Sequence, residues 1–207
     1  MVLKGDRIAD LLENPPNPAD PLVITPQPDP HELRTSGSAS IDLRLGTWFI
    51  TLRQSRAAVL TLSEKEKQAP RGRLARSQYV PFGGEYVLHP GHFVLGATME
   101  WIRFSAKVSG YVVGKSSWGR RGLVIATAVG VHPGFSGCLT LEITNLGEMP
   151  IEIIPGMQIC QLFIHEVASD SDDDEKDRTS FLGKRRPVLG SIKLDSIAEA
   201  LRISDPA

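Results

Sequence analysis

Residues 139–145 read Leu-Thr-Leu-Glu-Ile-Thr-Asn, and this stretch carries the strongest indication of the fold. Apolar residues take every second position and polar residues the positions between them, namely Leu139, Leu141 and Ile143 against Thr140, Glu142 and Thr144. Successive side chains of a β-strand point to opposite faces, so this alternation predicts a strand with one apolar and one polar face. Because an unpaired carboxylate is costly to bury, Glu142 lies either on a solvated sheet face or in a polar site.

The rest of the chain repeats this pattern in short apolar runs that glycine and proline separate. Many short strands with such turns predict a mainly-β domain, built as a sandwich or a distorted jelly-roll barrel with a few short helices. Asp6–Glu13 has the spacing of a short amphipathic helix, and the prolines of residues 14–30 predict an extended backbone. The predicted strands are Ser40–Leu45, Tyr86–His89, Phe93–Ala97, Trp101–Phe104, Gly110–Val113, Leu123–Ala128, Leu139–Asn145, Ile151–Ile154 and Gln158–His165.

The domain organisation follows from length and local composition. A chain of 207 residues fits one domain with an extended tail. The β domain is expected over residues 1–168, including the N-terminal helix and the proline-rich extension. Residues 169–207 are expected to form an acidic linker at Asp170–Asp177 and a C-terminal tail with a short helix at Ser191–Ile203. The basic stretch of residues 53–76 is interpreted as a solvated loop.

Charge and hydropathy exclude several classes of protein. The formal net charge of −1 at pH 7 does not favour a nucleic acid polymer or an anionic membrane surface as the partner. The longest apolar runs, such as Leu123–Ala128, are too short to span a bilayer. The N-terminal residues lack the apolar stretch of a signal peptide, so a cytoplasmic protein is expected.

The cysteines restrict the metal chemistry. Cys138 and Cys160 lie in apolar strand-like runs and are expected to be buried, unreactive thiols, although two cysteines allow one disulfide. Zinc-dependent base deaminases use H-x-E and P-C-x-x-C motifs to hold and use the metal. Neither motif occurs in this chain, so a deamination by this chain would activate water without zinc.

Two segments that precede the 139–145 strand carry candidate binding residues. Gly114–Gly122 reads GKSSWGRRG, in which serines before a short helical turn, with cations nearby, predict an N-cap and a phosphate site. A capped surface turn is the alternative. Ala128–Gly137 reads AVGVHPGFSG and predicts a rigid turn whose backbone reads the edge of a flat base. Phe135 would stack on a sugar or a base, or else it is a core aromatic.

The ordered set of these motifs resembles the trimeric dCTP deaminase family, which shares its fold with dUTPases. The resemblance spans most of residues 38–165, and so many motifs in one order are improbable by chance. The matching motifs are Ser40–Gly46 (SIDLRLG), Lys115–Ser117 (KSS), Arg120–Leu123 (RRGL), Thr127 with Ala128, Pro133–Gly137 (PGFSG), Leu141-Glu142 with Asn145, and Pro155–Leu162 (PGMQICQL).

The resemblance implies a dUTPase-like fold assembled as a homotrimer, with sites at the subunit interfaces. It implies hydrolytic deamination of dCTP to dUTP and ammonia, so that the partner is a deoxynucleoside triphosphate. Mg²⁺ is then the expected cofactor, held mainly through the triphosphate of the substrate and not by a set of protein ligands. The resemblance also implies that a C-terminal tail, here Thr179–Gly190, closes over the nucleotide.

The resemblance further assigns roles residue by residue. Glu142 is the expected general base. Arg120 and Ser116 are expected to pair with Glu142 or with the developing tetrahedral centre. The expected nucleotide-binding residues are Lys115, Ser117, Ala128, Val129, Val131, His132, Phe135, Gln161 and Lys184.

The chain departs from the pattern of the family at several positions. His132 stands where an aspartate is usual near the deoxyribose, and Lys115 replaces the first phosphate-binding arginine. Lysine keeps the charge of arginine but loses its bidentate geometry. In the tail, Phe181 and Lys184 replace the usual residues.

Two alternative functions remain open. One is a dUTPase, or a bifunctional enzyme that also cleaves the triphosphate. This reaction needs a base at the α-phosphate, usually an aspartate in the turn that now holds His132, so deamination is favoured. The other is a non-catalytic nucleotide sensor of the same fold. Glu142 argues against a sensor, because a sensor has little reason to keep a costly carboxylate in a strand.

Overall fold

The computed structural model describes residues 1–52, 75–127, 130–168, 182–190 and 196–197. In this part of the chain, three short helices accompany a much larger number of strands, which confirms the predicted mainly-β fold. The elements are α1 (Gly5–Glu13), β1 (Val23–Thr25), α2 (Pro30–Thr35), β2 (Ile41–Arg44), β3 (Trp48–Leu52), β4 (Ala75–Tyr79), β5 (Tyr86–Leu88), β6 (Phe93–Arg103), β7 (Val108–Gly114), α3 (Ser116–Gly119), β8 (Leu123–Ile125), β9 (Gly130–Val131), β10 (Ser136–Asn145), β11 (Ile151–Ile153) and β12 (Gln158–Glu166).

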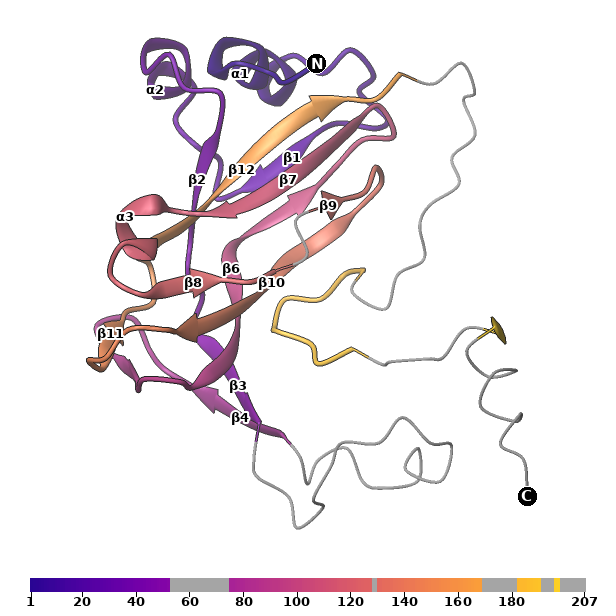
Figure 1. Ribbon diagram of the computed structural model, residues 1–207. Helices are drawn as coiled ribbons and strands as arrows, with labels where there is room; N and C mark the ends of the chain where they lie inside the picture. Colours follow the sequence, from indigo (N-terminus) through magenta and orange to yellow (C-terminus); the bar gives the residue numbers. More distant parts are fainter. Residues whose placement is uncertain (53–74, 128–129, 169–181, 191–195, 198–207) are drawn as a thin grey trace.

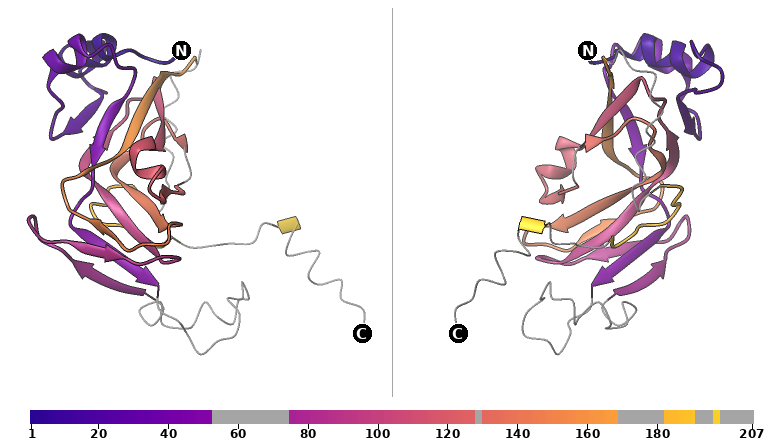
Figure 2. Two further views of the ribbon diagram at one scale, coloured as in Figure 1. Left: turned by 60° about the vertical axis from the view of Figure 1, so that its left-hand side comes forward. Right: turned by 90° about the vertical axis from the view of Figure 1, so that its right-hand side faces the viewer.

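The strands form two main antiparallel sheets around one core (Figure 1). The larger sheet has the order β4-β3-β6-β10-β8, and β1 pairs with the end of β6. The smaller sheet has the order β2-β12-β7-β9, and β11 pairs separately with β5. The helices α1 and α2 lie together at one end of the molecule, and β3 and β4 lie at the other, as a second direction of view confirms (Figure 2). Leu43, Leu141 and Leu162, which come from both main sheets, are fully buried in the shared core.

The predicted alternation of residues 139–145 is confirmed in β10. Leu141 and Ile143 are fully buried, whereas Thr140, Glu142 and Thr144 are half-buried on the opposite face. Glu142 lies opposite Leu95 of β6, in the middle of the central strand pair. The strand therefore anchors the core with one face and presents a carboxylate with the other.

The prediction of two separate strands at Phe93–Ala97 and Trp101–Phe104 is wrong, because β6 runs without a break from Phe93 to Arg103. Residues 94–98 are buried one after another, on both faces of the sheet. A strand that is covered on both faces does not show the alternation by which strands are recognised in a sequence.

The proline-rich stretch 14–30 is also more structured than predicted. Val23–Thr25 forms β1 against the end of β6, and α2 begins at Pro30. The carboxylate of Asp29 accepts a hydrogen bond of 2.9 Å from the backbone N–H of His31 and caps this helix. Proline at the first helical position is favourable because its φ angle suits a helix. The helix predicted at Asp6–Glu13 is confirmed as α1, with Ile8 fully buried.

Several sequence predictions lie outside the described residues. These are most of the basic stretch of residues 53–76, the acidic linker at residues 170–177 and most of the helix predicted at residues 191–203. In the described part of the chain, no helix has both the length and the apolar character needed to cross a bilayer.

Cys138 and Cys160 are buried free thiols, which confirms the prediction for both. Burial raises the pKa of the Cys138 thiol, and it raises the pKa of Cys160 to about 12. A thiol with such a pKa is almost fully protonated at neutral pH, and the thiolate is the reactive form. Both cysteines are therefore core residues.

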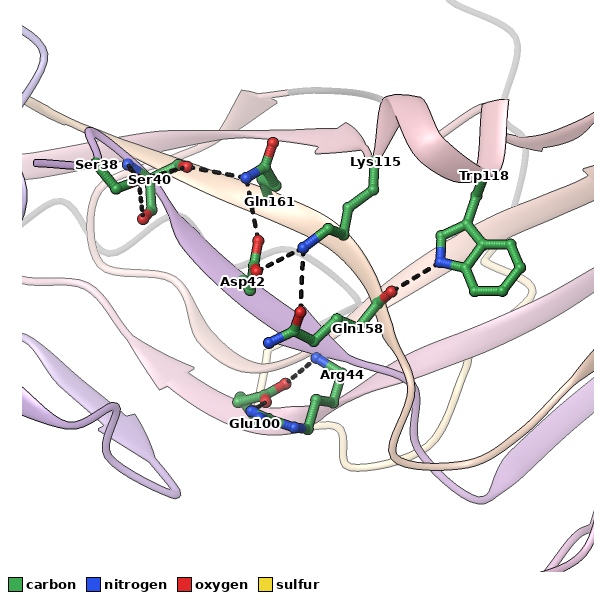
Figure 3. Close-up of polar contacts among 9 residues, drawn as sticks. All are labelled: Ser38, Ser40, Asp42, Arg44, Glu100, Lys115, Trp118, Gln158 and Gln161. Atoms are coloured by element: carbon green, nitrogen blue, oxygen red, sulfur yellow. Dashed lines mark hydrogen bonds and ion pairs between the residues drawn. The ribbon is translucent and has the colours of Figure 1, made fainter. Parts of the chain in front are cut away.

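Glu100 is a buried carboxylate of β6, exposed by only 4%. One of its oxygens accepts a hydrogen bond of 2.9 Å from the backbone N–H of Arg44, and the guanidinium of Arg44 lies 3.8 Å from the other (Figure 3). Burial raises the pKa of the Glu100 carboxyl, and both contacts with Arg44 act in the opposite direction. The net effect of the fold is thus to disfavour the ionised form.

We therefore expect Glu100→Gln to stabilise the fold at pH 7, because the amide carries no charge that burial disfavours. A folded-state pKa above the unfolded value means that stability is lost as the pH rises through this range. The neutral amide avoids this loss, so the gain in stability should be smaller at pH 4 than at pH 7. Thermal unfolding of both proteins at pH 4 and pH 7 measures the difference. An equal effect at the two pH values would contradict the explanation.

Candidate functional site

A cluster of polar side chains lies where β7 ends beside β2 and β12 (Figure 3). Lys115 follows β7 directly, and its Nζ lies 2.5 Å from Oδ2 of Asp42 on β2. The same ammonium donates a hydrogen bond of 3.1 Å to Oε1 of Gln158 at the start of β12. Lys115 and Asp42 are both mostly buried, with side-chain exposures of 22% and 30%. The charge of the lysine is therefore balanced within the chain.

Gln161 joins the same cluster from β12. It lies opposite Asp42 in the β2–β12 pairing, and its Nε2 donates to Oδ1 of Asp42 at 3.0 Å. A second hydrogen bond of 3.2 Å connects Gln161 with the hydroxyl of Ser40. The two oxygens of Asp42 thus hold Lys115 and Gln161, which were both predicted to bind the nucleotide.

The helix α3 differs from the prediction. It begins at Ser116, so the N-cap is Lys115, whose side chain makes no capping hydrogen bond. The predicted capping role of the serines is therefore wrong. Ser116 and Ser117 lie in the helical turn itself, with exposed side chains. Arg120, the residue after α3, is exposed as well.

A cavity of about 480 Å³ lies beside α3. Two contacts shape its wall: the indole N–H of Trp118 donates to the backbone oxygen of Gln158 at 3.0 Å, and Nη1 of Arg121 donates to the backbone oxygen of Ser117 at 2.7 Å. The donors at its surface suit an anionic group. The lining residues are Lys115, Ser117, Trp118, Arg121 and Gln158.

Gly122 joins α3 to β8 through a tight turn. Its φ of +90° lies in the region that favours glycine, and a Cβ here would lie 2.5 Å from the backbone nitrogen of Gly147. The backbone N–H of Leu146 donates to the oxygen of Gly122 at 2.8 Å. The loop that follows β10 therefore holds the end of the α3 segment.

Glu142 is held by its backbone in a separate part of the chain. Its N–H donates to the hydroxyl of Thr127 at 2.8 Å, and its oxygen accepts a hydrogen bond of 2.8 Å from Ala126. Within the described residues, the carboxylate makes no hydrogen bond or ion pair. The predicted pairing of Glu142 with Arg120 or Ser116 does not occur within one chain in that part of the structure. The carboxylate is thus left available to a ligand or to another chain.

The turn before β10 is only partly described, because Ala128 and Val129 lie outside the described residues. Val131 pairs with Gly110 of β7, and its side chain is buried. His132 is exposed, and its oxygen accepts a hydrogen bond of 3.3 Å from Phe135. Phe135 is half-buried against the core, which supports the interpretation of this residue as a core aromatic.

The described tail segment, residues 182–190, runs along the first half of β10. Backbone hydrogen bonds of 2.5 Å and 2.8 Å connect Gly183 with Ser136 and Lys184 with Cys138. Further on, the N–H of Val188 donates to the hydroxyl of Thr140 at 3.3 Å, which places the tail beside the face that carries Glu142. The exposed Lys184 is not among the residues that line the α3 cavity, so the structure does not bring it together with Lys115.

Several residues of the cluster and the cavity have no role predicted from the sequence. For Asp42 a signal existed, because it takes the polar position of an alternating strand in the same way as Glu142 does. The other residues gave no such signal, since their positions depend on chain segments far apart in the sequence. In the described part of the chain, no group of three or more His, Cys, Asp or Glu side chains is arranged to hold a metal ion. The residues without an assigned role are Ser40, Asp42, Trp118, Arg121 and Gln158.

Comparison with known proteins identifies the family of the chain. A family model described as dCTP deaminase-like matches residues 2–167. A dCTP deaminase, dUMP-forming, from Methanobrevibacter smithii is 31% identical over 178 residues, which cover 84% of this chain and 89% of that protein. A dCTP deaminase from Natronomonas pharaonis is 39% identical over 153 residues, which cover 73% of this chain and 75% of that protein.

A solved structure shows the same fold. The 2'-deoxycytidine 5'-triphosphate deaminase from Agrobacterium tumefaciens superimposes with a TM-score of 0.57 at 22% sequence identity. The match covers 81% of this chain and 48% of that chain. The family match spans about four fifths of the sequence. The chain belongs to the dCTP deaminase-like family.

Proposed function

We propose that this chain catalyses the hydrolytic deamination of dCTP, in which dCTP and water give dUTP and ammonia. The observation that carries the proposal is Glu142, a half-buried carboxylate in the middle of β10 without a partner in the described residues. Its backbone is tied to Ala126 and Thr127, which lead directly into the turn that was predicted to read the base. A base held in this way can act on water beside a bound pyrimidine.

In the proposed mechanism, Glu142 takes a proton from a water molecule that attacks C4 of the cytosine ring. The tetrahedral centre that forms carries the new hydroxyl and the old amine. Glu142 delivers this proton to the ring nitrogen N3, then takes the proton of the new hydroxyl and passes it to the amine. The bond between C4 and the exocyclic nitrogen breaks, the C4 carbonyl forms, and ammonia leaves. Arg120 and Ser116 stabilise the charge that develops at this centre.

The remaining predicted residues bind the nucleotide around this centre. Lys115, Ser117 and Gln161 hold the phosphates and the sugar, and Phe135 limits the space at the ribose 2′ position. The backbone of residues 128–131 reads the pyrimidine edge. His132 lies at the position where a hydrogen bond to the 3′-hydroxyl is required, and a neutral histidine has one acceptor nitrogen for it.

We further infer a homotrimer in which adjacent chains complete each site. Within one chain, no described contact connects Glu142 with Arg120 or Ser116, although the mechanism requires them at the same reacting centre. A neighbouring subunit can supply the missing group. The tail belongs to the same proposal. Residues 182–190 contact Thr140, two positions before Glu142. In the sequence this tail follows the predicted acidic linker, which starts at residue 169, and the tail would close over the nucleotide. The proposed location is the cytoplasm.

Mg²⁺ enters this proposal as part of the substrate. The cavity beside α3 is lined by cationic and neutral donors and by an indole, and both oxygens of the nearby Asp42 already accept hydrogen bonds. The chain therefore supplies donors that suit phosphate oxygens, and the ion would be held by the triphosphate itself. When bound, Mg²⁺ neutralises part of the phosphate charge.

A bifunctional reaction is the second candidate. The Methanobrevibacter smithii relative, 31% identical over most of both chains, is described as dUMP-forming. In this chain, His132 occupies the turn position where a base for hydrolysis at the α-phosphate is expected. Formation of dUMP would therefore require His132, or another group, to orient that water.

Product analysis distinguishes these candidates. The chain is incubated with dCTP, CTP or dUTP, each with Mg²⁺, and nucleotides and ammonia are quantified, while sedimentation measures the mass of the assembly. We expect dUTP and ammonia in equal amounts from dCTP, much slower reaction of CTP, and the mass of three chains. Formation of dUMP and diphosphate would establish the bifunctional reaction. Absence of turnover with all three nucleotides would contradict the proposal and favour a nucleotide sensor.

A further inference from the structure

The two cations of the α3 cavity differ in their charge balance. Lys115 donates to the carboxylate of Asp42 at 2.5 Å and to Gln158 at 3.1 Å, so its ammonium is already neutralised and two of its three N–H groups are in use (Figure 3). An anion that binds to Lys115 has to compete with Asp42 at very short range. Lys115 is therefore poorly suited to be the main source of positive charge in the cavity.

Arg121 also lies on the wall of this cavity, but no carboxylate of the described residues pairs with its guanidinium. In the described part of the chain, the only hydrogen bond or ion pair of its guanidinium is the hydrogen bond of 2.7 Å from Nη1 to the backbone oxygen of Ser117. This contact holds the guanidinium at the backbone of Ser117 without neutralising its charge. A guanidinium has five N–H donors in a rigid fork, so four remain for a ligand.

We propose that Arg121 is the principal phosphate-binding cation of this cavity and that it contacts a phosphate group of the nucleoside triphosphate. Lys115 does not take this role because its ammonium is paired with Asp42. The planar fork of Arg121 supplies the bidentate phosphate contact that a lysine at position 115 does not make. The identity of the ligand rests on the proposed function, whereas the assignment of Arg121 rests on the cavity and its charges.

The test compares Arg121→Gln and Arg121→Lys with Arg7→Gln, which removes an exposed charge on α1 away from the cavity. Calorimetry measures the binding of inorganic triphosphate, and steady-state kinetics measure dCTP turnover. A charge-assisted hydrogen bond contributes enough that Arg121→Gln should raise the Kd and the KM about 10-fold to 100-fold. The kcat should change less than about 2-fold, because binding in the ground state and in the transition state is lost equally. Arg121→Lys should lie between, and Arg7→Gln should match wild type.

A second variant tests the neutralisation of Lys115. Asp42→Asn, introduced together with Arg121→Gln, frees the ammonium of Lys115 from its carboxylate and should recover part of the lost affinity for inorganic triphosphate. Arg120→Ala provides the contrast, because a residue at the reacting centre should lower kcat. Equal thermal unfolding of Arg121→Gln and wild type would show that the loss is local.

Two results would overturn the inference: an unchanged triphosphate affinity in Arg121→Gln, or no recovery after Asp42→Asn. The outcome is separate from that of the proposed function. If dCTP is not turned over but triphosphate binding depends on Arg121, the inference stands and the deaminase proposal fails. If dCTP is deaminated with an unchanged KM by Arg121→Gln, the inference fails and the deaminase proposal stands.

Discussion

Glu142→Gln is expected to reduce the turnover of dCTP by about 10²-fold to 10⁴-fold, the usual contribution of a general base. The amide keeps the size and shape of the side chain but cannot accept the proton of the attacking water. The backbone contacts of Glu142 with Thr127 and Ala126 do not involve the carboxylate, so the strand should be unaffected. Ammonia release measures the loss, and calorimetry should find dCTP affinity within about 3-fold of wild type, because uniform binding is retained.

Glu148→Gln provides the matched control for this variant. Glu148 is an exposed glutamate in the loop after β10, so the same chemical change there should leave kcat unchanged. If Glu142→Gln kept most of the activity, Glu142 would not be the general base. Loss of dCTP binding together with turnover would instead assign Glu142 to binding.

Asn145→Ala is expected to lower the free energy of unfolding by about 3 kcal/mol, because several buried polar groups lose their partner at once. Asn145 is fully buried at the end of β10. Its Nδ2 donates to the backbone oxygens of Leu88 at 2.9 Å and Met149 at 2.8 Å, and its Oδ1 accepts from Gly147 at 2.9 Å. Alanine satisfies none of these groups and leaves a gap in their place.

Thr144→Ala is the control for Asn145. Thr144 is the half-buried neighbour, and its hydroxyl makes one hydrogen bond of 3.1 Å to the oxygen of His92, so its loss should cost about 1 kcal/mol. Denaturant unfolding of the three proteins gives both differences. Similar losses for the two variants would contradict the view that Asn145 organises this loop. Asn145→Ala should also lower the turnover of dCTP, because the loop that it disturbs holds Gly122 behind α3.

The strand that carries Glu142 was predictable because its signal is local. A strand that packs one face on the core must alternate apolar and polar residues, and residues 139–145 do so with Leu141 and Ile143 inward. The helix α1 was predictable for the same reason with a helical period. The middle of β6 was not, since residues 94–98 are covered on both faces and show no alternation.

The residues of the candidate site divide in the same way. Their chemical types are local properties of short motifs, and these motifs sufficed to predict the family. The partners of these residues could not be predicted from the sequence. Asp42 lies 73 residues before Lys115 and 119 before Gln161. The three side chains meet because β2, β12 and β7 are neighbours in one sheet.

The charge state of the α3 cavity depends on this arrangement. In the sequence, Lys115 and Arg121 are two similar cations within one basic motif. In the fold, a carboxylate from a distant strand neutralises Lys115, while the guanidinium of Arg121 donates only to a backbone oxygen in the described part of the chain. Electrostatic interactions fall off with distance in space and not along the chain, so the local motif predicts which charges are present and the packing of the strands sets which of them is free to bind a ligand.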